Sequence, residues 1–280
     1  MRWDLGRSSG VQDRRGMGAG AIAGGGGIVT VVVALIGYFV FGIDPRTFLE
    51  TAPTQQVAGS GAVQASACPE GDTACQFADV IHTSTIDTWT PLFQARNQTY
   101  RPSQIALYTG GTQTGCGMGQ SAMGPFYCPA DDTIYIDLNF INTLEKDLGA
   151  GGDFAMAYVI AHEAGHHVQN VLGISEKVQA AQQRLSEREG NVLSVRLELQ
   201  ADCYAGVWAK QSNTKLNWLE AGDVEEGLRA AAAVGDDTLQ KRGQGMVVPD
   251  SFTHGSSADR MKWFRTGYDT GNPSACDTFG

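Results

Sequence analysis

A short run of residues near the middle of the chain could bind a metal ion and activate a water molecule. The run is His162-Glu163-Ala164-Gly165-His166. On a helix, residues four apart lie about 40° apart around the axis, so both imidazoles can reach one ion. Glu163 lies about 100° from His162 and can take a proton from a water without being a ligand. This H-E-x-x-H spacing is typical of zinc peptidases, and a chance match in such a chain has a probability of order 1%.

The residues around this motif predict the helix that carries it. Apolar or small side chains recur at i+3 and i+4 spacing, which is the pattern of one buried helix face. These residues are Phe154, Tyr158, Ala161, Gly165, Val168 and Leu172. Gly173 follows them and predicts the end of the helix.

A catalytic zinc ion needs three protein ligands and one open position. The pattern H-E-x-x-H-x-x-G-x-x-H, with a third histidine, is excluded because Gln169 and Leu172 occupy the required positions. The third ligand must therefore come from elsewhere in the chain, and a glutamate on a second helix is the alternative.

Two further helices are predicted after the motif, over residues 175–188 and 192–210, with Asn191 as the N-cap of the second. In the second helix, Glu198 and Asp202 lie four apart beside an apolar face. We expect Glu198 to complete the zinc site, in preference to Glu176, Glu187 and Glu189. Asp202, one turn later, is expected to accept a hydrogen bond from a histidine ligand and so fix its orientation.

Two residues near the carboxyl terminus are further candidates for the site. His254, in Thr253-His254-Gly255, could donate a hydrogen bond to the oxyanion that forms during peptide hydrolysis. A surface histidine that precedes a helix is the alternative. Arg260 could orient a carboxylate, including one on the substrate, or pack the helix that begins after Ser256.

Strands are predicted at residues 105–108 and 133–137 from their β-branched residues and alternation. An edge strand beside a metal-binding helix can hold an extended substrate by backbone hydrogen bonds. Residues 133–137 are our candidate, with Ile134, Tyr135 and Ile136 at the substrate. An ordinary packed strand is the alternative. The expected fold class is α+β, a mostly helical zincin-like domain with a small sheet.

The amino-terminal region predicts a membrane anchor. Residues 16–43 contain no charge, and residues 28–41 are strongly apolar. With the Gly/Ala-rich residues before them they exceed the roughly 20 residues needed to cross a bilayer. We expect a basic cytoplasmic segment at residues 1–18, a single transmembrane helix at 19–42, a flexible linker at 43–67 and an extracytoplasmic domain at 68–280. A cleaved signal peptide is the alternative, since Ala65-Ser66-Ala67 resembles a cleavage site.

All six cysteines follow this predicted span. None has C-x-x-C spacing, so disulfides are expected rather than a zinc knuckle. Nearness in the sequence favours two local pairs, which leaves one that ties the carboxyl-terminal tail to a helix. The expected pairs are Cys68 with Cys75, Cys116 with Cys128 and Cys203 with Cys276.

The chain of 280 residues has a formal net charge of −10 and no basic stripe. This composition argues against nucleic acid as a partner. Its length allows one anchor and one domain of about 200 residues with a substantial core.

Together these features resemble a known family. His162-Glu163-x-x-His166 with Glu198-x-x-x-Asp202 is similar to the gluzincin pattern. The run from Met1 to Arg7, the Gly-Pro-Phe-Tyr-Cys-Pro run and the Ala-Asp-Cys-Tyr-Ala-Gly-Val-Trp-Ala run resemble the bacterial putative neutral zinc metallopeptidase family over nearly the full length. The Thr-His-Gly element resembles the T-H-P element of CAAX-type gluzincins, with Gly255 in place of proline.

The resemblance implies a membrane-anchored endopeptidase with one Zn²⁺ ion that hydrolyses peptide bonds of proteins or peptides outside the cytoplasm through a metal-activated water. Glu163 would be the general base. Two alternatives remain open. One is a binding or assembly protein that keeps the fold without cleaving substrates, and the other is a zinc amidase that acts on cell-wall peptides.

Overall fold

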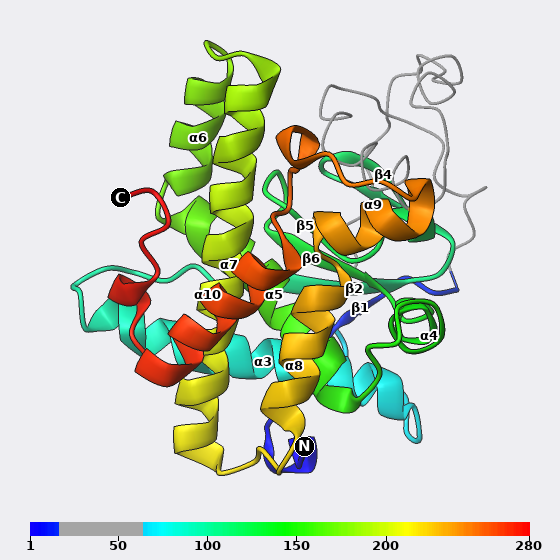
Figure 1. The fold of residues 1–280 in the computed structure, drawn as a ribbon. Helices are drawn as coiled ribbons and strands as arrows, with labels where there is room; N and C mark the ends of the chain where they lie inside the picture. Colours follow the sequence, from blue (N-terminus) through cyan, green and yellow to red (C-terminus); the bar gives the residue numbers. More distant parts are fainter. Residues whose placement is uncertain (17–63) are drawn as a thin grey trace, which may run out of the picture.

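The computed structural model describes residues 1–16 and 64–280, and Figure 1 shows their arrangement. The fold is α+β and mostly helical, as predicted. The longest helix, α7 (Glu187–Leu216), runs beside α5 (Asp153–Val171) and α10 (Ser257–Thr270). The other helical elements are η1 (Trp3–Leu5), α3 (Thr73–Gln94), η3 (Ser121–Met123), α4 (Phe140–Asn142), η4 (Thr143–Asp147), α6 (Ile174–Gln182), α8 (Asp223–Ala233), α9 (Asp236–Gln244), η5 (Pro249–Ser251) and η6 (Pro273–Ala275).

The main sheet has the strand order β1-β2-β6-β5, and a separate hairpin pairs β3 with β4. The strands are β1 (Gln12–Asp13), β2 (Gln104–Tyr108), β3 (Gly111–Thr114), β4 (Gly117–Gln120), β5 (Phe126–Cys128) and β6 (Thr133–Asp137). Strand β6 pairs with β2 in parallel and with β5 antiparallel. The prediction that residues 133–137 form an edge strand is therefore wrong. Ile134, Tyr135 and Ile136 are fully buried in the interior of the sheet, and β5 lies at its edge among the described residues.

Helix α7 begins earlier than its sequence pattern predicted. Ser186 and Glu189 form a capping box, in which the serine side chain accepts from the Glu189 amide and the glutamate accepts from the Ser186 amide. Asn191, our predicted N-cap, lies inside the helix. Helix α6 ends at Gln182, earlier than the predicted residue 188, and it forms an antiparallel pair with the start of α7 that projects from the body (Figure 1).

Helices α7 and α10 touch backbone to backbone. A Cβ atom at Gly206 would lie 2.1 Å from the Phe264 carbonyl oxygen, and one at Gly267 would lie 1.9 Å from the Cys203 carbonyl oxygen. Any larger residue at either position would push the helices apart. This contact brings the amino-terminal end of α10, with Arg260, close to α7.

The three predicted disulfides are confirmed. Cys68 pairs with Cys75, Cys116 with Cys128, and Cys203 with Cys276. The third bond fixes the carboxyl-terminal segment to α7, 73 residues away in sequence. Cys203 and Cys276 are both buried in a hydrophobic cluster with Trp89, Tyr204 and Val207.

Residues 1–16 are part of the same folded unit as residues 64–280. Trp3 packs edge-on against Phe77, and β1 adds to the sheet beside β2. Val11 exchanges two backbone hydrogen bonds of 2.9 Å with Ser66. A single crossing of a bilayer between residues 19 and 42 would separate Val11 from Ser66 by a hydrocarbon layer about 30 Å thick. A molecule that crosses the bilayer once between residues 19 and 42 cannot also form the hydrogen bonds between Val11 and Ser66.

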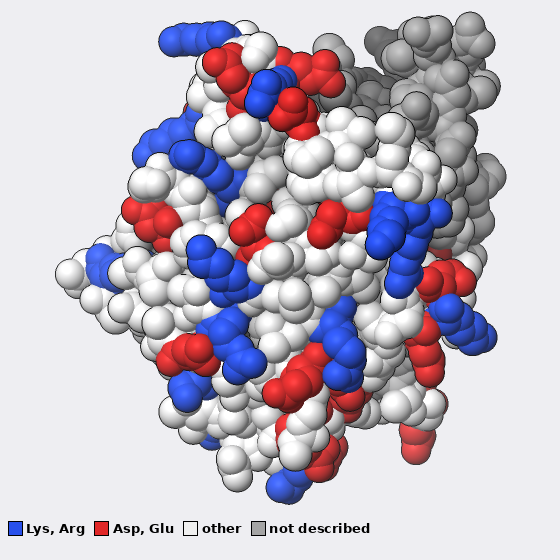
Figure 2. Space-filling view, in the orientation of Figure 1, with Lys and Arg blue, Asp and Glu red and all other residues white. Residues whose placement is uncertain are grey.

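The predicted transmembrane helix at 19–42 and most of the predicted linker at 43–67 lie outside the described residues. Among the helices that the structure describes, none combines the length and apolar character needed to cross a bilayer. On the face shown in Figure 2, acidic and basic side chains are interspersed over α7, α8 and α10 and form no continuous stripe of one sign.

Candidate metal centre

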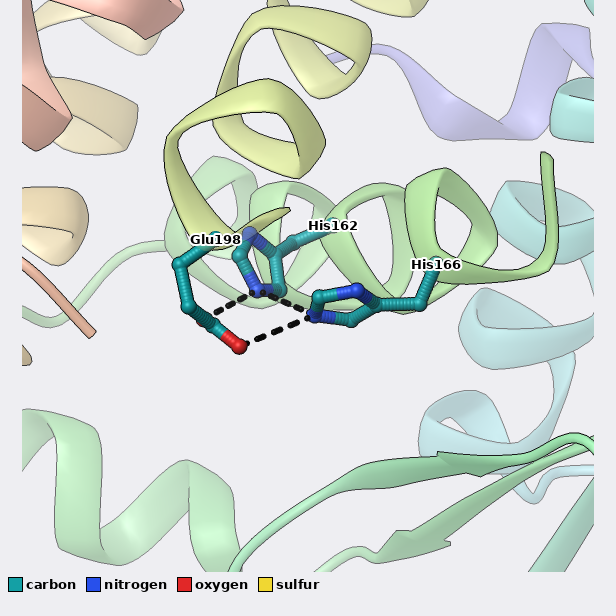
Figure 3. A group of neighbouring side chains, drawn as sticks. All are labelled: His162, His166 and Glu198. Atoms are coloured by element: carbon teal, nitrogen blue, oxygen red, sulfur yellow. Dashed lines mark hydrogen bonds and ion pairs between the residues drawn. The ribbon is translucent and has the colours of Figure 1, made fainter. Parts of the chain in front are cut away.

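The structure brings the three predicted metal ligands together. His162 and His166 extend from neighbouring turns of α5, and Glu198 reaches them from α7, so the three side chains point toward one another (Figure 3). The two Nε2 atoms are 3.1 Å apart. The Glu198 carboxylate oxygens lie 3.2 Å from His162 Nε2 and 3.3 Å from His166 Nε2.

These distances and hydrogen positions fit a zinc ion. A tetrahedral ion with bonds near 2.05 Å holds its ligand atoms about 3.3 Å apart. The Nδ1 atom of each ring faces an oxygen acceptor, Asp202 Oδ1 at 2.8 Å for His162 and Gln169 Oε1 at 2.9 Å for His166. Both Nδ1 atoms therefore carry hydrogen in the neutral rings, and both Nε2 atoms present lone pairs. When both rings are neutral, three electron-pair donors converge, and this arrangement is satisfied by a cation, either a proton or a metal ion.

Gly165 allows the two helices to approach closely enough for this. A Cβ atom at Gly165 would lie 3.0 Å from both the Cα and the carbonyl oxygen of Ala201. The small residues between the two histidines therefore form the contact surface for α7. Glu198 lies less than one turn before Ala201, so this contact sets its distance from the histidines.

Asp202 supports His162 as predicted. The carboxylate is fully buried and accepts hydrogen bonds from His162 Nδ1, from the Tyr158 hydroxyl at 2.5 Å and from Arg260. Burial alone would raise the pKa of Asp202, but the charges of Arg260 and His162 hold the pKa below its ordinary value. The carboxylate therefore stays ionised and keeps accepting from His162.

Arg260 orients this carboxylate rather than a substrate. Its Nε donates to Asp202 Oδ2 at 2.8 Å and its Nη2 to Asp202 Oδ1 at 3.0 Å. The side chain is only 3% exposed and also donates to the carbonyl oxygen of Val234. The expectation that Arg260 belongs to the substrate-binding residues is therefore wrong, because its donors are directed at groups of the protein.

Glu163 lies beside the two histidines and is nearly buried. Burial raises the pKa of this carboxyl above its ordinary value, although the nearby His166 and His162 oppose the shift. The backbone of Tyr127, in strand β5, also lowers the pKa of Glu163 and so favours the charged form. The group is thus a stronger base than an exposed glutamate and lies next to the edge of the sheet.

His254 is held near the site by a loop built on Asp236. One Asp236 oxygen accepts from the backbone amides of Thr253, His254 and Gly255, at 2.8, 2.6 and 2.9 Å. The other oxygen lies 3.2 Å from His254 Nδ1. Burial disfavours a charged ring, but the hydrogen bond to Asp236 raises the pKa of His254 above its ordinary value. In the protonated ring, Nδ1 donates to Asp236 and the hydrogen on Nε2 is left to donate to a substrate.

Two other histidines are structural. His82 is buried in α3 with Nε2 3.1 Å from the Ser103 hydroxyl. His167 follows His166 but points to the other side of α5, where its ring contacts the Tyr127 hydroxyl at 3.0 Å and the Arg101 carbonyl oxygen at 2.6 Å.

Three residues of the site had not been predicted: Asp236, Gln169 and Tyr127. Asp236 is 18 positions from His254, and no local pattern links them. Gln169 could have been found from its position, because it lies one turn after His166 on the same helix. Tyr127 contributes through its backbone, and a backbone contact cannot be predicted from the type of residue.

Comparison with known proteins agrees with this geometry. A family model described as "Putative neutral zinc metallopeptidase" matches residues 1–279. The uncharacterized protein YpfJ of Escherichia coli strain K12 is 48% identical over 291 residues, which cover 100% of this chain and 99% of that protein. The uncharacterized protein Rv2575 of Mycobacterium tuberculosis strain H37Rv is 43% identical over 256 residues, or 86% of this chain and 84% of that protein. No solved structure is significantly similar.

Family membership supports a zinc-dependent peptidase at the general level, which would act on proteins or peptides. This family membership agrees with the presence of His162, His166 and Glu198 where α5 and α7 meet. The chain therefore belongs to the family of neutral zinc metallopeptidases that this description covers.

Proposed function

We propose that this protein is a zinc endopeptidase with a single ion bound by His162, His166 and Glu198. The observation that carries the proposal is the convergence of two imidazole nitrogens and one carboxylate on a single point, with the Glu163 carboxyl group, whose pKa is raised, beside them. A zinc ion held there supplies Lewis acidity toward a water molecule and toward the scissile carbonyl.

Glu163 acts as the general base. It takes a proton from the attacking water and returns it to the leaving amine, so the same carboxyl group serves as base and then as acid. Its raised pKa helps the first step, because a carboxylate with a higher pKa is a better proton acceptor.

His254 stabilises the negative charge that develops on the substrate oxygen. Asp236 holds the ring through Nδ1, accepts from the backbone amides around His254 and favours the protonated ring, in which Nε2 is a donor. The substrate backbone pairs with β5 instead of β6. This assignment is supported by the edge position of β5 among the described strands and by the effect of the Tyr127 backbone on the Glu163 pKa, which places the strand near that carboxyl group.

The test is the change Glu163→Gln in the full chain. We expect zinc content to be unchanged and peptide hydrolysis to fall by about 100- to 10,000-fold, the usual contribution of general acid-base catalysis. Glu176→Gln, an exposed glutamate on α6, is the matched control and should keep full activity. A fully active Glu163→Gln enzyme would contradict the mechanism.

Substrate panels separate the alternatives. A wild-type protein that binds zinc but cleaves no member of a diverse peptide library would indicate a binding or assembly protein. Turnover confined to cell-wall peptides would indicate an amidase with the same chemistry. Cleavage within ordinary polypeptides supports the endopeptidase.

We also propose that the folded unit works outside the cytoplasm. Its three disulfides support this location, because such bonds persist in oxidising compartments and are rare in the cytoplasm. Residues 1–16 pack on this unit, so the proposal applies to them as well.

Single cysteines at the exposed positions Ser8 and Thr214 test the location. A membrane-impermeant maleimide added to intact cells should label both Ser8→Cys and Thr214→Cys. Labelling of Thr214→Cys alone would support an amino terminus in the cytoplasm and contradict the packing of residues 1–16. Labelling of neither would contradict the proposed compartment.

A further inference from the structure

The support of His166 differs from that of His162. His162 donates to a buried carboxylate, whereas His166 Nδ1 faces the neutral amide of Gln169, with 2.9 Å between Nδ1 and Oε1. An amide can present either oxygen or NH₂, so the tautomer of His166 depends on which end faces it.

The other contacts of Gln169 determine that orientation. Its Nε2 lies 2.7 Å from the Leu197 carbonyl oxygen and 3.1 Å from Gln200 Oε1. A backbone carbonyl can only accept, so the NH₂ group must face Leu197. Both amide hydrogens are then used, and the oxygen faces His166. A reversed amide would place two oxygens against each other.

Gln200 is fixed in the same way. Its Nε2 donates to the Cys276 carbonyl oxygen at 2.9 Å, which leaves Oε1 to accept from Gln169. Cys276 is held against α7 by its disulfide with Cys203. The Thr278 hydroxyl also donates to the Arg196 carbonyl oxygen at 2.7 Å. The carboxyl-terminal segment thus provides a fixed acceptor at the far end of a chain of hydrogen bonds.

Burial restricts the hydrogen bonds of these two glutamine side chains to their protein partners. Gln169 is 0% exposed and Gln200 is 5% exposed, so solvent cannot replace a lost partner. A buried polar group that loses its hydrogen-bond partner destabilises the folded state. The two amides are therefore confined to one arrangement.

We propose that Gln169 and Gln200 are positioning residues that hold His166 as its Nδ1–H tautomer, with the lone pair of Nε2 directed at the metal. The Cys276 carbonyl oxygen, in the carboxyl-terminal segment, is the fixed acceptor that orients Gln200 and, through Gln200, also Gln169. This inference depends on the proposed function only in requiring that His166 binds zinc. His166 is thus oriented by uncharged groups, two glutamine side chains and two backbone carbonyl oxygens. They correspond to the charged Asp202 carboxylate that orients His162.

The first test measures zinc affinity in the full chain by competition with a chelator. Gln169→Met keeps the side-chain length and removes the hydrogen bonds, so zinc binding should weaken by about 10- to 100-fold, as for other residues that orient metal ligands. Gln200→Met should weaken binding less, because Leu197 still orients Gln169. Gln182→Met, which removes a similar contact between α6 and α7, should leave zinc affinity unchanged.

The second measurement is the tautomer itself, read from the ring ¹⁵N shifts of His166 in the metal-free protein at a pH where the ring is neutral. We expect hydrogen on Nδ1 in the wild type and a tautomer mixture in Gln169→Met. Unchanged zinc affinity and an unchanged tautomer in Gln169→Met would overturn the inference. If Gln169→Met does not fold, unchanged values in Gln200→Met would overturn it. A wild-type protein that binds no zinc would instead overturn the proposed function.

Discussion

Two groups of side chains that could bind a cation lie on or against α5, and their surroundings differ. At the first turn, the carboxylates of Asp153, Asp223 and Glu226 each offer an oxygen within 4.8 Å of the others. The Met1 ammonium group donates to Asp153 at 2.8 Å and to Asp223 at 3.3 Å. Two of the three carboxylates in the first group are therefore paired with a cation of the chain itself, whereas the group in the middle of α5 holds a proton on His162 that a metal ion would displace.

The difference shows that clustered carboxylates do not by themselves indicate a metal site. What distinguishes the site at Glu198 is that the surrounding structure has already directed both histidine N–H groups elsewhere. The predictions below test whether the two groups are as different as this geometry implies.

The largest expected effect follows from Glu198→Gln. Zinc sites contribute roughly 10–16 kcal/mol, so the loss of one of three ligands should cost about 4 kcal/mol, or roughly a thousandfold in zinc affinity. Asp223→Asn is the counterpart at the other group and should leave zinc affinity unchanged. Zinc affinity that falls equally in both variants, measured by chelator competition, would contradict the distinction.

A smaller effect is expected where the metal site depends on a buried ion pair. Arg260→Met leaves the Asp202 carboxylate buried without its guanidinium partner. Breaking such a pair costs about 3–5 kcal/mol, and we expect the lower value because Tyr158 and His162 still donate to Asp202. Urea unfolding of the metal-free protein measures this loss. Arg188→Met, which removes the exposed ion pair with Asp250, should cost under about 1 kcal/mol.

The group at the first turn of α5 should affect stability alone. Asp223→Asn weakens a charge-assisted hydrogen bond to the Met1 ammonium group and should lower the free energy of unfolding by about 1.5 kcal/mol. Hydrolysis per folded molecule should stay at the wild-type level. A loss of activity without a loss of stability would indicate that this group also contributes to the site.

The two groups should respond to pH in opposite directions. Burial disfavours the charged Met1 amine, but the hydrogen bond to Asp153 raises its pKa above its ordinary value. Because the folded pKa is the higher one, this stabilisation is complete below about pH 8 and is lost as pH rises through the folded pKa.

Zinc binding should instead strengthen as pH rises. Although burial opposes it, the Asp202 carboxylate raises the pKa of His162 to about 10, so in the metal-free protein zinc must displace a proton. Affinity should rise by about tenfold per pH unit for each proton displaced, up to that pKa. Titrations of zinc affinity and of unfolding free energy between pH 6 and 10, repeated in Asp223→Asn, would show whether the trends are separate.

The metal ligands could be predicted from the sequence because their geometry is local. The spacing of His162 and His166 follows from the helical repeat, and Glu198 with Asp202 repeats it on a second helix. The disulfides were also predictable, since two pairs are close in the sequence and the third follows by elimination.

The remaining features depend on non-local packing. The strand at residues 133–137 was recognised, but its interior position follows from pairing with β2 and β5, which no local pattern shows. Arg260 was recognised without its partner, because Asp202 is 58 residues away. The amino-terminal segment was expected to flank a membrane span, yet Trp3 and Val11 pack into the folded unit.

The glycine contacts between α7 and α10 set a limit on how this protein can change. Gly206 and Gly267 bring main chain against main chain, so no side chain between them can adjust to absorb strain. Any movement of α10 must therefore carry α7 with it. A substrate that displaces the loop around His254 would have to bend the connection after Gly255 and leave the helix pair, with Asp202 and Arg260 between them, as a rigid base.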